Sequence, residues 1–288
     1  MLVSSALAPS SQKAYQSAWS KFVSFARSHG LPSSLPVPPE HLLWFCTALA
    51  NGGLAHSSIL PILSAISYFH KLHDVGDSTK DFKLQQLLSS LRKSGASSDS
   101  RQPITQDILM KILDQLATSQ LSVYERRLYR AMFLTSFNYG LRLGEVSESP
   151  HNLMLSSIFI TSSCFQLTFN SFKHSVGPPV THLIQASASQ LCPVSAMNIY
   201  LSSRGNLPGP LFILRGAAVK RRVFTARLQS LVLRCGFQIR LTSHSFRIGA
   251  ATWWAHLNYS EAKIKQLGRW RSNAFLKYLR GPVSHPST

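Results

Sequence analysis

Two residues with complementary chemistry stand three positions apart in the segment LTSHSFRIGAAT, residues 241–252. His244 can donate or accept a proton, and Arg247 carries a fixed positive charge with parallel N–H donors. If a helix begins here, both side chains point the same way, because residues three apart share a helix face. Such a pair suits an anion, above all phosphate. Alone, this spacing is more typical of an ordinary solvated helix start.

Three other segments carry residues of a similar kind. GLRLGE sets Arg142 three positions before Glu145, so on one helix the carboxylate would hold the guanidinium in a fixed orientation. NSFKHSVG carries Lys173 between two strand-like runs, and LGRWRSNAFLKYLR carries Trp270 and Tyr278. Taken singly, these features are typical of a helical ion pair, a solvated turn lysine and a half-buried tyrosine.

Net charge is the strongest signal in the composition. The chain has 30 Lys and Arg against 11 Asp and Glu, a formal net charge of +19. Residues 1–150 have a net charge of +4, whereas residues 151–288 hold 16 basic residues and a single acidic one, Glu261. A polyanionic partner is therefore expected, with nucleic acid first and an anionic membrane surface second.

The scarcity of acidic residues in the second half of the chain argues against a two-metal enzyme site there. Metal-dependent nucleases need clustered carboxylates to hold divalent ions, and only Glu261 follows Glu148. His70 and His73 lie on an apolar helical pattern without a third ligand, so we expect packed or partly exposed histidines and no metal. Four widely spaced cysteines indicate reduced, mostly buried, intracellular thiols: Cys46, Cys164, Cys192 and Cys235. We expect neither a membrane span nor a secretory signal.

Hydrophobic periodicity divides the chain into two domains. Helical patterns at 10–28, 39–52, 57–72 and 81–93 predict a helical bundle over residues 1–95. Residues 96–103 are polar and read as a linker. Residues 104–288 predict a mainly helical domain with two or three short antiparallel strands within 158–172 and 180–184, and with helices at 105–116, 122–139, 193–203, 224–235, 244–257, 260–267 and 272–280.

The order Arg … Lys … His-x-x-Arg … Leu-Gly-x-x … Tyr resembles the tyrosine recombinase (phage-type integrase) family over nearly the whole chain. GLRLGE, SHSFRIGAAT and LGRW…KY carry the resemblance, and the GRW form with HSSILPILSAISYFHKL resembles most closely the eukaryotic Crypton and DIRS-like mobile-element recombinases. The resemblance implies a mainly α fold with a small antiparallel β-sheet. Its parts would be a helical core-binding (DNA-binding) domain and a catalytic domain like that of tyrosine recombinases and type IB topoisomerases.

The resemblance also implies roles for single residues. Tyr278 would attack the scissile phosphate to give a 3′-phosphotyrosyl link, while Arg142 and Arg247 clamp the phosphate. Lys173 would protonate the leaving oxygen, and His244 would assist in proton transfer. Glu145 would support Arg142. The exchange of one phosphoester for another requires neither metal nor ATP, so no cofactor is expected.

One part of the match departs from the family pattern. The family's usual Leu-Gly-His…Tyr motif places Arg269, not Trp270, on the second histidine position. Either residue can fill the role: Arg269 as a third cation, or Trp270 after a local backbone shift. Trp270 is favoured, since an N–H donor on a flat apolar ring can bond the phosphate and cover Tyr278.

Double-stranded DNA is the expected partner. Basic residues outside the site are predicted to contact its backbone: Lys220, Arg221, Arg222, Arg227, Lys263, Lys265 and Arg271. The resemblance implies a homo-oligomer, a tetramer on DNA, although the tail GPVSHPST is short for a docking helix. We expect a nuclear protein in a eukaryotic host and otherwise a cytoplasmic protein on DNA.

The leading hypothesis is an active site-specific recombinase or integrase. The first alternative is a catalytically silent, mobile-element-derived DNA-binding protein, although every chemical position is filled. A type IB topoisomerase would use the same chemistry without strand exchange. A protein of anionic membranes would explain the charge but not the ordered set of residues.

Overall fold

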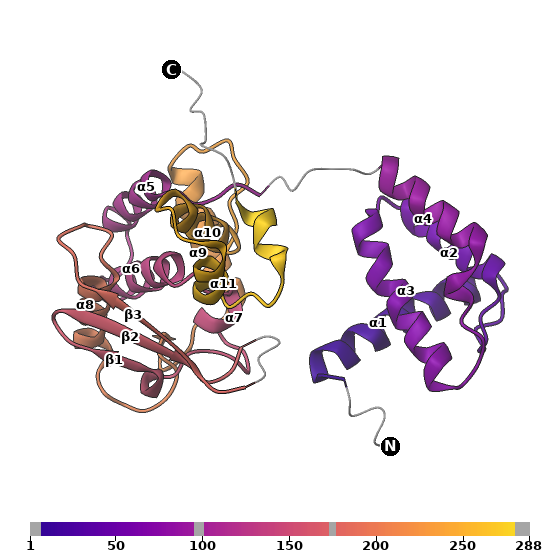
Figure 1. The fold of residues 1–288 in the computed structure, drawn as a ribbon, viewed down its shortest axis with the longest axis horizontal. Coiled ribbons are helices and arrows are strands. Elements are labelled where there is room, and N and C mark those ends of the chain that lie inside the picture. Colours follow the sequence, from indigo (N-terminus) through magenta and orange to yellow (C-terminus); the bar gives the residue numbers. More distant parts are fainter. Residues whose placement is uncertain (1–6, 95–100, 173–176, 280–288) are drawn as a thin grey trace. The chain divides into compact units, whose positions relative to one another are not determined.

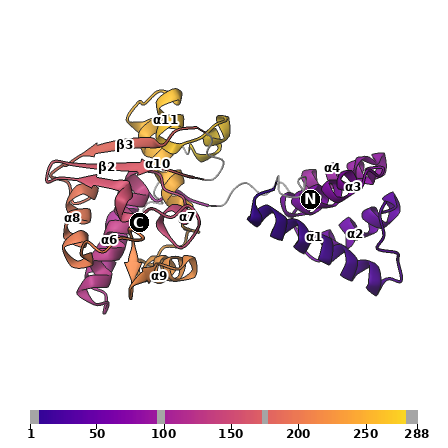
Figure 2. The same cartoon turned by 90° about the horizontal axis from the view of Figure 1, so that it is seen from below.

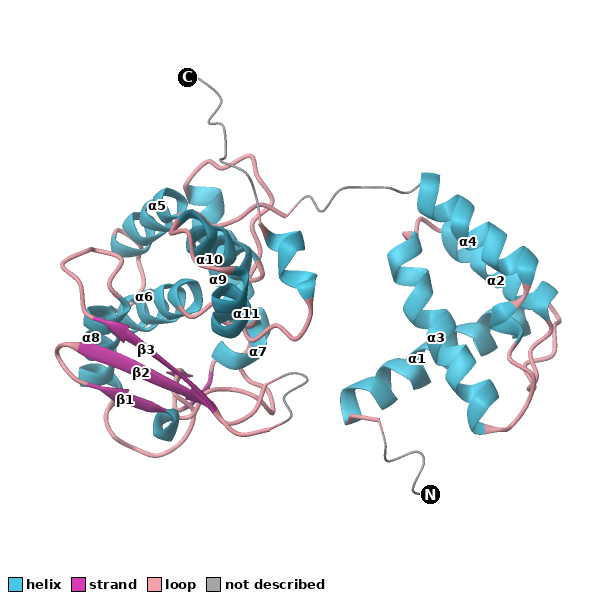
Figure 3. Cartoon of the chain, viewed as in Figure 1, coloured by secondary structure: helices cyan, strands magenta, loops and turns pink. Residues whose placement is uncertain are grey.

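The computed structural model describes residues 7–94, 101–172 and 177–279 of the 288-residue chain. The chain groups into two compact units, Met1–Asp99 and Ser100–Thr288, each with its own hydrophobic core. Figure 1 labels their elements, and Figure 3 shows that helices predominate in both. Of the predicted linker, residues 96–100 lie outside the described residues, and residues 101–103 form no regular element.

Unit 1 is a helical bundle whose helices begin at ordinary sequence signals. Both α1 and α2 start with a proline. Proline is tolerated in the first turn of a helix, because backbone N–H groups there have no carbonyl partner within the helix. Phe22, Phe45 and Ile66, from three successive helices, lie in the buried core. The elements are α1 (Pro9–Ser28), α2 (Pro39–Asn51), α3 (His56–Leu72), the 3₁₀ helix η2 (Ser78–Lys80) and α4 (Phe82–Ser94).

His70 is a core residue of unit 1, in agreement with the expectation of a packed histidine. Its ring is fully buried; Nε2 accepts a hydrogen bond from the Val37 amide at 3.0 Å, and Nδ1 lies 2.8 Å from the Ile66 carbonyl oxygen. Nε2 therefore joins α3 to the segment before α2, while Nδ1 bonds within α3. Among the described residues, no group of three His, Cys, Asp or Glu side chains is placed to hold a metal ion.

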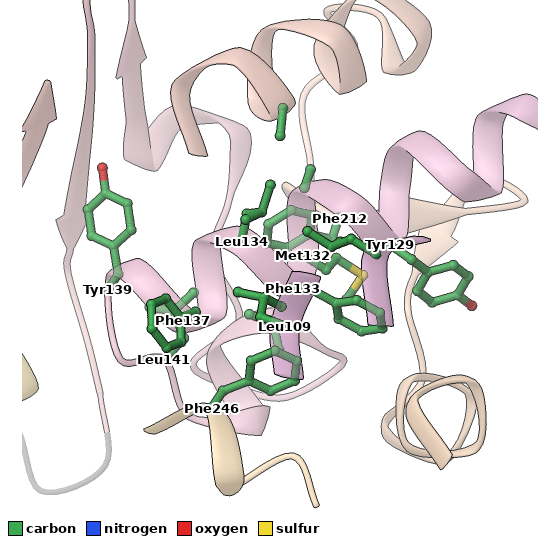
Figure 4. Packing of buried hydrophobic residues seen from close by; sticks show 14 of the residues in the cluster. Leu109, Tyr129, Met132, Phe133, Leu134, Phe137, Tyr139, Leu141, Phe212 and Phe246 are labelled. Carbon is green, nitrogen blue, oxygen red and sulfur yellow. The ribbon is translucent and has the colours of Figure 1, made fainter. Parts of the chain in front are cut away.

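Unit 2 is built around α6, which is buried from Leu128 to Phe137 apart from Arg130. In Figure 4, Phe133 of this helix lies against Phe246, and the two ring centroids are 5.4 Å apart. The helices of unit 2 are α5 (Gln106–Ala117), α6 (Val123–Asn138), α7 (Leu143–Val146), η3 (Leu155–Ser157), α8 (Pro193–Arg204), α9 (Arg221–Arg234), α10 (Ser245–His256), α11 (Glu261–Gly268) and η4 (Asn273–Tyr278).

A three-stranded antiparallel sheet completes the core of unit 2, as the strand-like runs predict. Its order is β1-β2-β3, and Leu167 on the middle strand pairs with Ile158 and His182 on either side. Figure 2 shows α8 and α6 on one side of the sheet. The strands are β1 (Ile158–Ile160), β2 (Cys164–Phe169) and β3 (Val180–Gln185). The mainly helical fold with a small antiparallel sheet is confirmed.

A second, two-stranded sheet was not predicted. It pairs β4 (Ile213–Leu214) with β5 (Ala217–Ala218). Strands of two residues are too short to show the alternation of apolar and polar side chains by which a strand is recognised. Within the described part of the chain, no helix combines the length and the apolar character that a membrane crossing requires.

Candidate active site

Segments far apart in the sequence meet at the C-terminal end of α6. The carbonyl groups there carry the partial negative charge of the helix dipole. Arg247 donates from Nη1 to the Gly140 oxygen at 2.5 Å, across 107 residues of sequence. Arg269 donates from Nη1 to the Tyr139 oxygen at 3.2 Å, across 130 residues. The end of α6 therefore gathers two arginines from the C-terminal part of the chain.

Gly140 makes this approach possible. Its backbone has a φ of +55°, which glycine adopts without the steric penalty that a side chain brings. A Cβ atom at this position would lie 2.8 Å from the ring of Trp254 on α10. A larger residue at position 140 would therefore strain the turn and push α10 away from α6.

Arg142 and Glu145 form the predicted ion pair, but they do not lie within one helix. Arg142 has an extended backbone, with φ of −81° and ψ of 151°, and stands directly before α7. The Glu145 carboxylate accepts from the Arg142 amide at 2.8 Å and from Arg142 Nη1 at 3.1 Å. The pair thus caps this short helix, and the Arg142 side chain remains 24% exposed, within reach of a ligand.

Glu145 is buried between two cations. Its second partner is Arg269, whose Nη2 lies 2.8 Å from Glu145 Oε2. Burial alone would raise the pKa of the Glu145 carboxyl, but Arg269, Arg142 and the Arg142 amide together outweigh it and hold that pKa below its ordinary value. The carboxylate is therefore charged near neutral pH.

Arg269 points into the protein. It has a left-handed backbone, with φ of 54° and ψ of 48°, at the end of α11. Its side chain is 1% exposed, and its guanidinium lies 3.8 Å from the centre of the Phe169 ring on β2. In this position Arg269 holds Glu145 and does not lie beside Tyr278.

Arg247 is the second enclosed cation of the site. It projects from α10, is 1% exposed, and donates to the carbonyl oxygens of Gly140 and Gly268. The Trp270 ring covers its guanidinium, with a centroid distance of 4.1 Å. Burial, then the nearby charges of Arg142 and Arg269, lowers the pKa of Arg247 well below its ordinary value.

Tyr278 lies between two other aromatic groups. Its ring centroid is 5.0 Å from that of His244, in an edge-on contact, and 5.6 Å from that of Trp270. Its carbonyl oxygen accepts a hydrogen bond from Thr252 Oγ1 at 3.1 Å, which ties η4 to α10. Of the two residues considered for the second histidine position, Trp270 is the one in contact with Tyr278.

Gly268 is required by the position of Trp270. A Cβ atom on residue 268 would lie 1.6 Å from a ring carbon of Trp270, which is far too close for two non-bonded atoms. The indole therefore lies directly over the backbone at the end of α11. Of the helix predicted over residues 272–280, the segment Asn273–Tyr278 is the 3₁₀ helix η4, and residue 280 lies outside the described residues.

The residues predicted to contact DNA differ in exposure. Arg227 is half-buried, with its guanidinium 5.5 Å from the Tyr129 ring centroid, and Lys265 is half-buried near Phe275. The Arg221 side chain lies close to Gly144 of α7. A Cβ atom added to Gly144 would lie 2.9 Å from Nη2 of Arg221. The other residues predicted to contact DNA are exposed: Lys220, Arg221, Arg222, Lys263 and Arg271.

Lys173, the predicted general acid, lies outside the described residues.

One buried residue near the site was not predicted. His182 lies on the inward face of β3, edge-on to Phe169. Burial, reinforced by Arg269 and Lys263, lowers the pKa of His182 to about 4. The alternation in VTHLI is the signal that could have placed this histidine on the inward face of its strand.

The sequence matches no protein-family model and is not significantly similar to any curated protein. The fold, in contrast, is similar to solved structures of recombinases. A lambda integrase dimer bound to a COC′ core site has 17% identity and a TM-score of 0.68, with 100% of this chain and 76% of that one covered. The XerH site-specific recombinase bound to palindromic difH substrate has 15% identity and a TM-score of 0.66, with 93% and 75% covered.

A third similar structure is a lambda integrase tetramer bound to a Holliday junction, with 17% identity, a TM-score of 0.65, and 98% of this chain and 75% of that chain covered. At these identities the similarity defines the fold, which is that of the tyrosine recombinases and integrases. The narrower resemblance to Crypton and DIRS-like recombinases stays a prediction.

Proposed function

We propose that the protein is a site-specific DNA recombinase that cleaves and rejoins double-stranded DNA through a 3′-phosphotyrosyl intermediate. One observation carries the proposal. The Tyr278 ring packs against His244 and Trp270, and Trp270 covers Arg247, on a fold that DNA recombinases share. A tyrosine hydroxyl beside a proton carrier and a guanidinium has the chemistry required to attack a phosphodiester.

The reaction is a transesterification. The Tyr278 oxygen attacks phosphorus and loses its proton, with His244 as the proposed acceptor or relay, while the bond to the 5′ oxygen breaks. Lys173, the proposed general acid, protonates that leaving oxygen. Arg142 and Arg247 neutralise charge on the non-bridging oxygens. Attack by a 5′ hydroxyl on the phosphotyrosine reverses the steps, so neither ATP nor a metal ion is consumed.

The Trp270 indole is the proposed occupant of the second histidine position. Its ring lies against both Arg247 and Tyr278, so it holds the cation and the nucleophile on one side of the site. Its N–H is the group that we assign to a phosphate oxygen in the DNA complex. Arg269 has no part in phosphate contact in this proposal, because Glu145 and Phe169 hold it inside the protein.

The DNA duplex is the proposed partner. The exposed basic residues, chiefly those at the start of α9, supply cations for its backbone. The similar structures include a dimer on a core site and a tetramer on a Holliday junction. By extension we propose that this protein acts as an oligomer on DNA, in the nucleus if its host is eukaryotic.

The first test is covalent trapping. The purified protein is incubated in EDTA with a pool of nicked duplexes, and denaturing gels are used to detect a protein–DNA adduct. We expect an adduct that is lost in Tyr278→Phe and kept in Tyr259→Phe, the control, since Tyr259 is an exposed tyrosine.

Two results would overturn the proposal. An adduct that persists in Tyr278→Phe would exclude this nucleophile. Salt-sensitive DNA binding without any adduct would favour the catalytically silent DNA-binding protein. If an adduct forms, joining of two differently labelled duplexes distinguishes recombination from supercoil relaxation by a topoisomerase.

A further inference from the structure

We propose that Arg269 is a positioning residue, which acts through Glu145 to fix the direction of the Arg142 guanidinium in the cleavage site. The inference rests on the proposed function and deepens it. It concerns a residue that the motif comparison would place at the phosphate but that the structure places behind Arg142. The observation that carries it is the chain of contacts Arg269–Glu145–Arg142, in which the central carboxylate is buried.

Arg269 contacts Arg142 by two routes. Its side chain donates to Glu145 Oε2 at 2.8 Å, and Glu145 Oε1 in turn accepts from Arg142 Nη1 at 3.1 Å. Its backbone carbonyl oxygen accepts directly from Arg142 Nη2 at 3.2 Å. Two guanidinium nitrogens of Arg142 are therefore held by groups whose own positions depend on Arg269. A guanidinium is planar and its N–H bonds lie in that plane, so two directed hydrogen bonds limit its rotation and set the direction of the remaining donors.

Arg269 is itself held in place from several directions. Besides Glu145, its guanidinium donates to the carbonyl oxygens of Tyr139 at 3.2 Å, Leu267 at 3.1 Å and Gly140 at 3.4 Å. The Phe169 ring closes one face. These bonds connect the end of α6, the end of α11 and α7. Arg142 and Trp270 are attached to the same three elements or lie directly beside them.

The left-handed backbone of Arg269 separates two neighbouring side chains. It turns the Arg269 side chain inward to Glu145, while the next residue, Trp270, packs on Arg247 and Tyr278. A left-handed conformation is unusual for a residue other than glycine, and the surrounding structure must hold it. The fixed inward position of Arg269 therefore accompanies the position of Trp270 in the site.

Loss of the Arg269 charge should change cleavage and not DNA affinity. The charged groups that face Glu145 are Arg142, Arg269 and Arg247. Without Arg269, the carboxylate loses a partner on one side, and Arg142 is free to follow it away from the phosphate. Affinity depends mainly on exposed cations elsewhere, such as Arg221 and Arg222, which such a change leaves in place.

The experiment compares Arg269→Met, Arg269→Lys, Glu145→Gln and the double variant Arg269→Met/Glu145→Gln. Single-turnover cleavage of a prebound nicked duplex is measured beside DNA affinity. We expect cleavage to fall about 100-fold in Arg269→Met, as misplacement of a catalytic group by about 1 Å does. Affinity should change less than about twofold. The double variant should be no slower than the slower single variant, because the residues act as one unit.

Arg269→Lys keeps the positive charge, so it still tests the inference if Arg269→Met fails to fold. It can pair with Glu145 but cannot donate to Tyr139 and Gly140 in the same fork, so we expect an intermediate cleavage rate. The matched control is Arg204→Met. Arg204 is also a buried arginine bonded to backbone carbonyl groups, but it lies at the end of α8 and contacts none of the site residues. It should lower stability and leave the cleavage rate of the folded protein unchanged.

A second readout does not depend on cleavage. In the parent protein, the side-chain N–H resonance of Arg142 in an NMR spectrum should exchange slowly with water, and in Arg269→Met it should broaden or exchange fast. Additive cleavage losses, parental cleavage in Arg269→Met or an unchanged Arg142 resonance would overturn the inference. An adduct in the parent with normal Arg269 variants overturns only this inference. Absence of any adduct overturns the proposed function, and the Arg142 resonance then decides the positioning role alone.

Discussion

Two groups of basic residues in unit 2 show how differently the same charge can be used. Arg247 and Arg269 are buried, and each donates to backbone carbonyl groups around the end of α6. Lys220, Arg221 and Arg222 at the start of α9 are exposed. The buried pair is fixed in direction, whereas the exposed group can adapt to phosphates in several positions.

Burial, and not charge alone, distinguishes basic residues suited to a fixed place in a site from basic residues suited to binding an anionic surface. A buried guanidinium loses its hydration and must recover that free energy through fixed partners, which give it one orientation. An exposed cation keeps its hydration and interacts only weakly with other charges, and dissolved salt screens this interaction. Changes in the two groups should therefore differ in size and in what they alter.

Arg247→Ala should have the largest effect. It removes the Arg247 bonds to the carbonyl oxygens of Gly140 and Gly268, leaves Gly140 with the longer bond from Arg269, and opens a cavity under Trp270. We therefore expect the free energy of unfolding to fall by about 3 kcal/mol. Adduct formation by the remaining folded protein should fall about 100- to 1,000-fold, since a charge-stabilising donor is gone. Urea unfolding and single-turnover cleavage measure the two. Normal cleavage by a destabilised variant would make Arg247 purely structural.

Gly268→Ala should have the next largest effect. The added methyl group collides with the Trp270 ring, which must leave Arg247 and Tyr278, and we expect a loss of about 1–3 kcal/mol. Thermal unfolding and cleavage measure it. The control is Gly76→Ala in unit 1, where nothing lies within 4 Å of the new Cβ atom. An equal effect in both variants would contradict the close packing of Trp270.

Acid should destabilise unit 2 through His182. Its pKa is about 4 in the folded protein and near 6.5 when unfolded, so between these values the unfolded chain binds the extra proton. Stability therefore falls as pH decreases from about 6.5, by about 1–2 kcal/mol at pH 5. Urea unfolding at pH 7 and pH 5 measures it. The difference should shrink in His182→Leu, and an unchanged difference would assign the acid sensitivity to another group.

Arg222→Ala should have the smallest effect. Loss of one phosphate contact should weaken binding to any DNA sequence by a few-fold and reduce the slope of log K against log salt by about 0.9. Titrations at several salt concentrations measure it. Arg234→Ala, at the other end of α9, is the control and should keep the parental slope. A loss confined to one DNA sequence would instead indicate a base contact.

Periodicity predicted most of the fold, because long elements repeat their signal. Thr105 and Ser122 cap α5 and α6 where the pattern places helix starts, and the run that contains β2 alternates in burial as a strand should. Arg142 shows the limit of this approach. Its spacing from Glu145 predicts a pair on one helix, but i and i+3 are also the cap and third residue of a helix start, and the sequence does not distinguish the two.

The site was predictable as a set of residues but not as an arrangement. The partners of the inward-pointing Arg269 side chain, Glu145 and Phe169, lie far away in the sequence, so no local pattern indicates its position. The contact of Trp270 with Tyr278 follows from the turn at Arg269. The motif therefore placed two candidates at one position, and the tertiary structure separates them.

The long sequence separations at the end of α6 have a consequence for how the site forms. Arg247 bonds a carbonyl group 107 residues earlier, and Arg269 one that is 130 residues earlier. Contacts of such separation require costly loop closure and usually form late in folding. During synthesis, α6 and Arg142 emerge well before the two arginines and Tyr278. We therefore expect the proposed cleavage site to be assembled only when unit 2 has completed its folding, so that nascent and partly folded chains would lack the proposed activity.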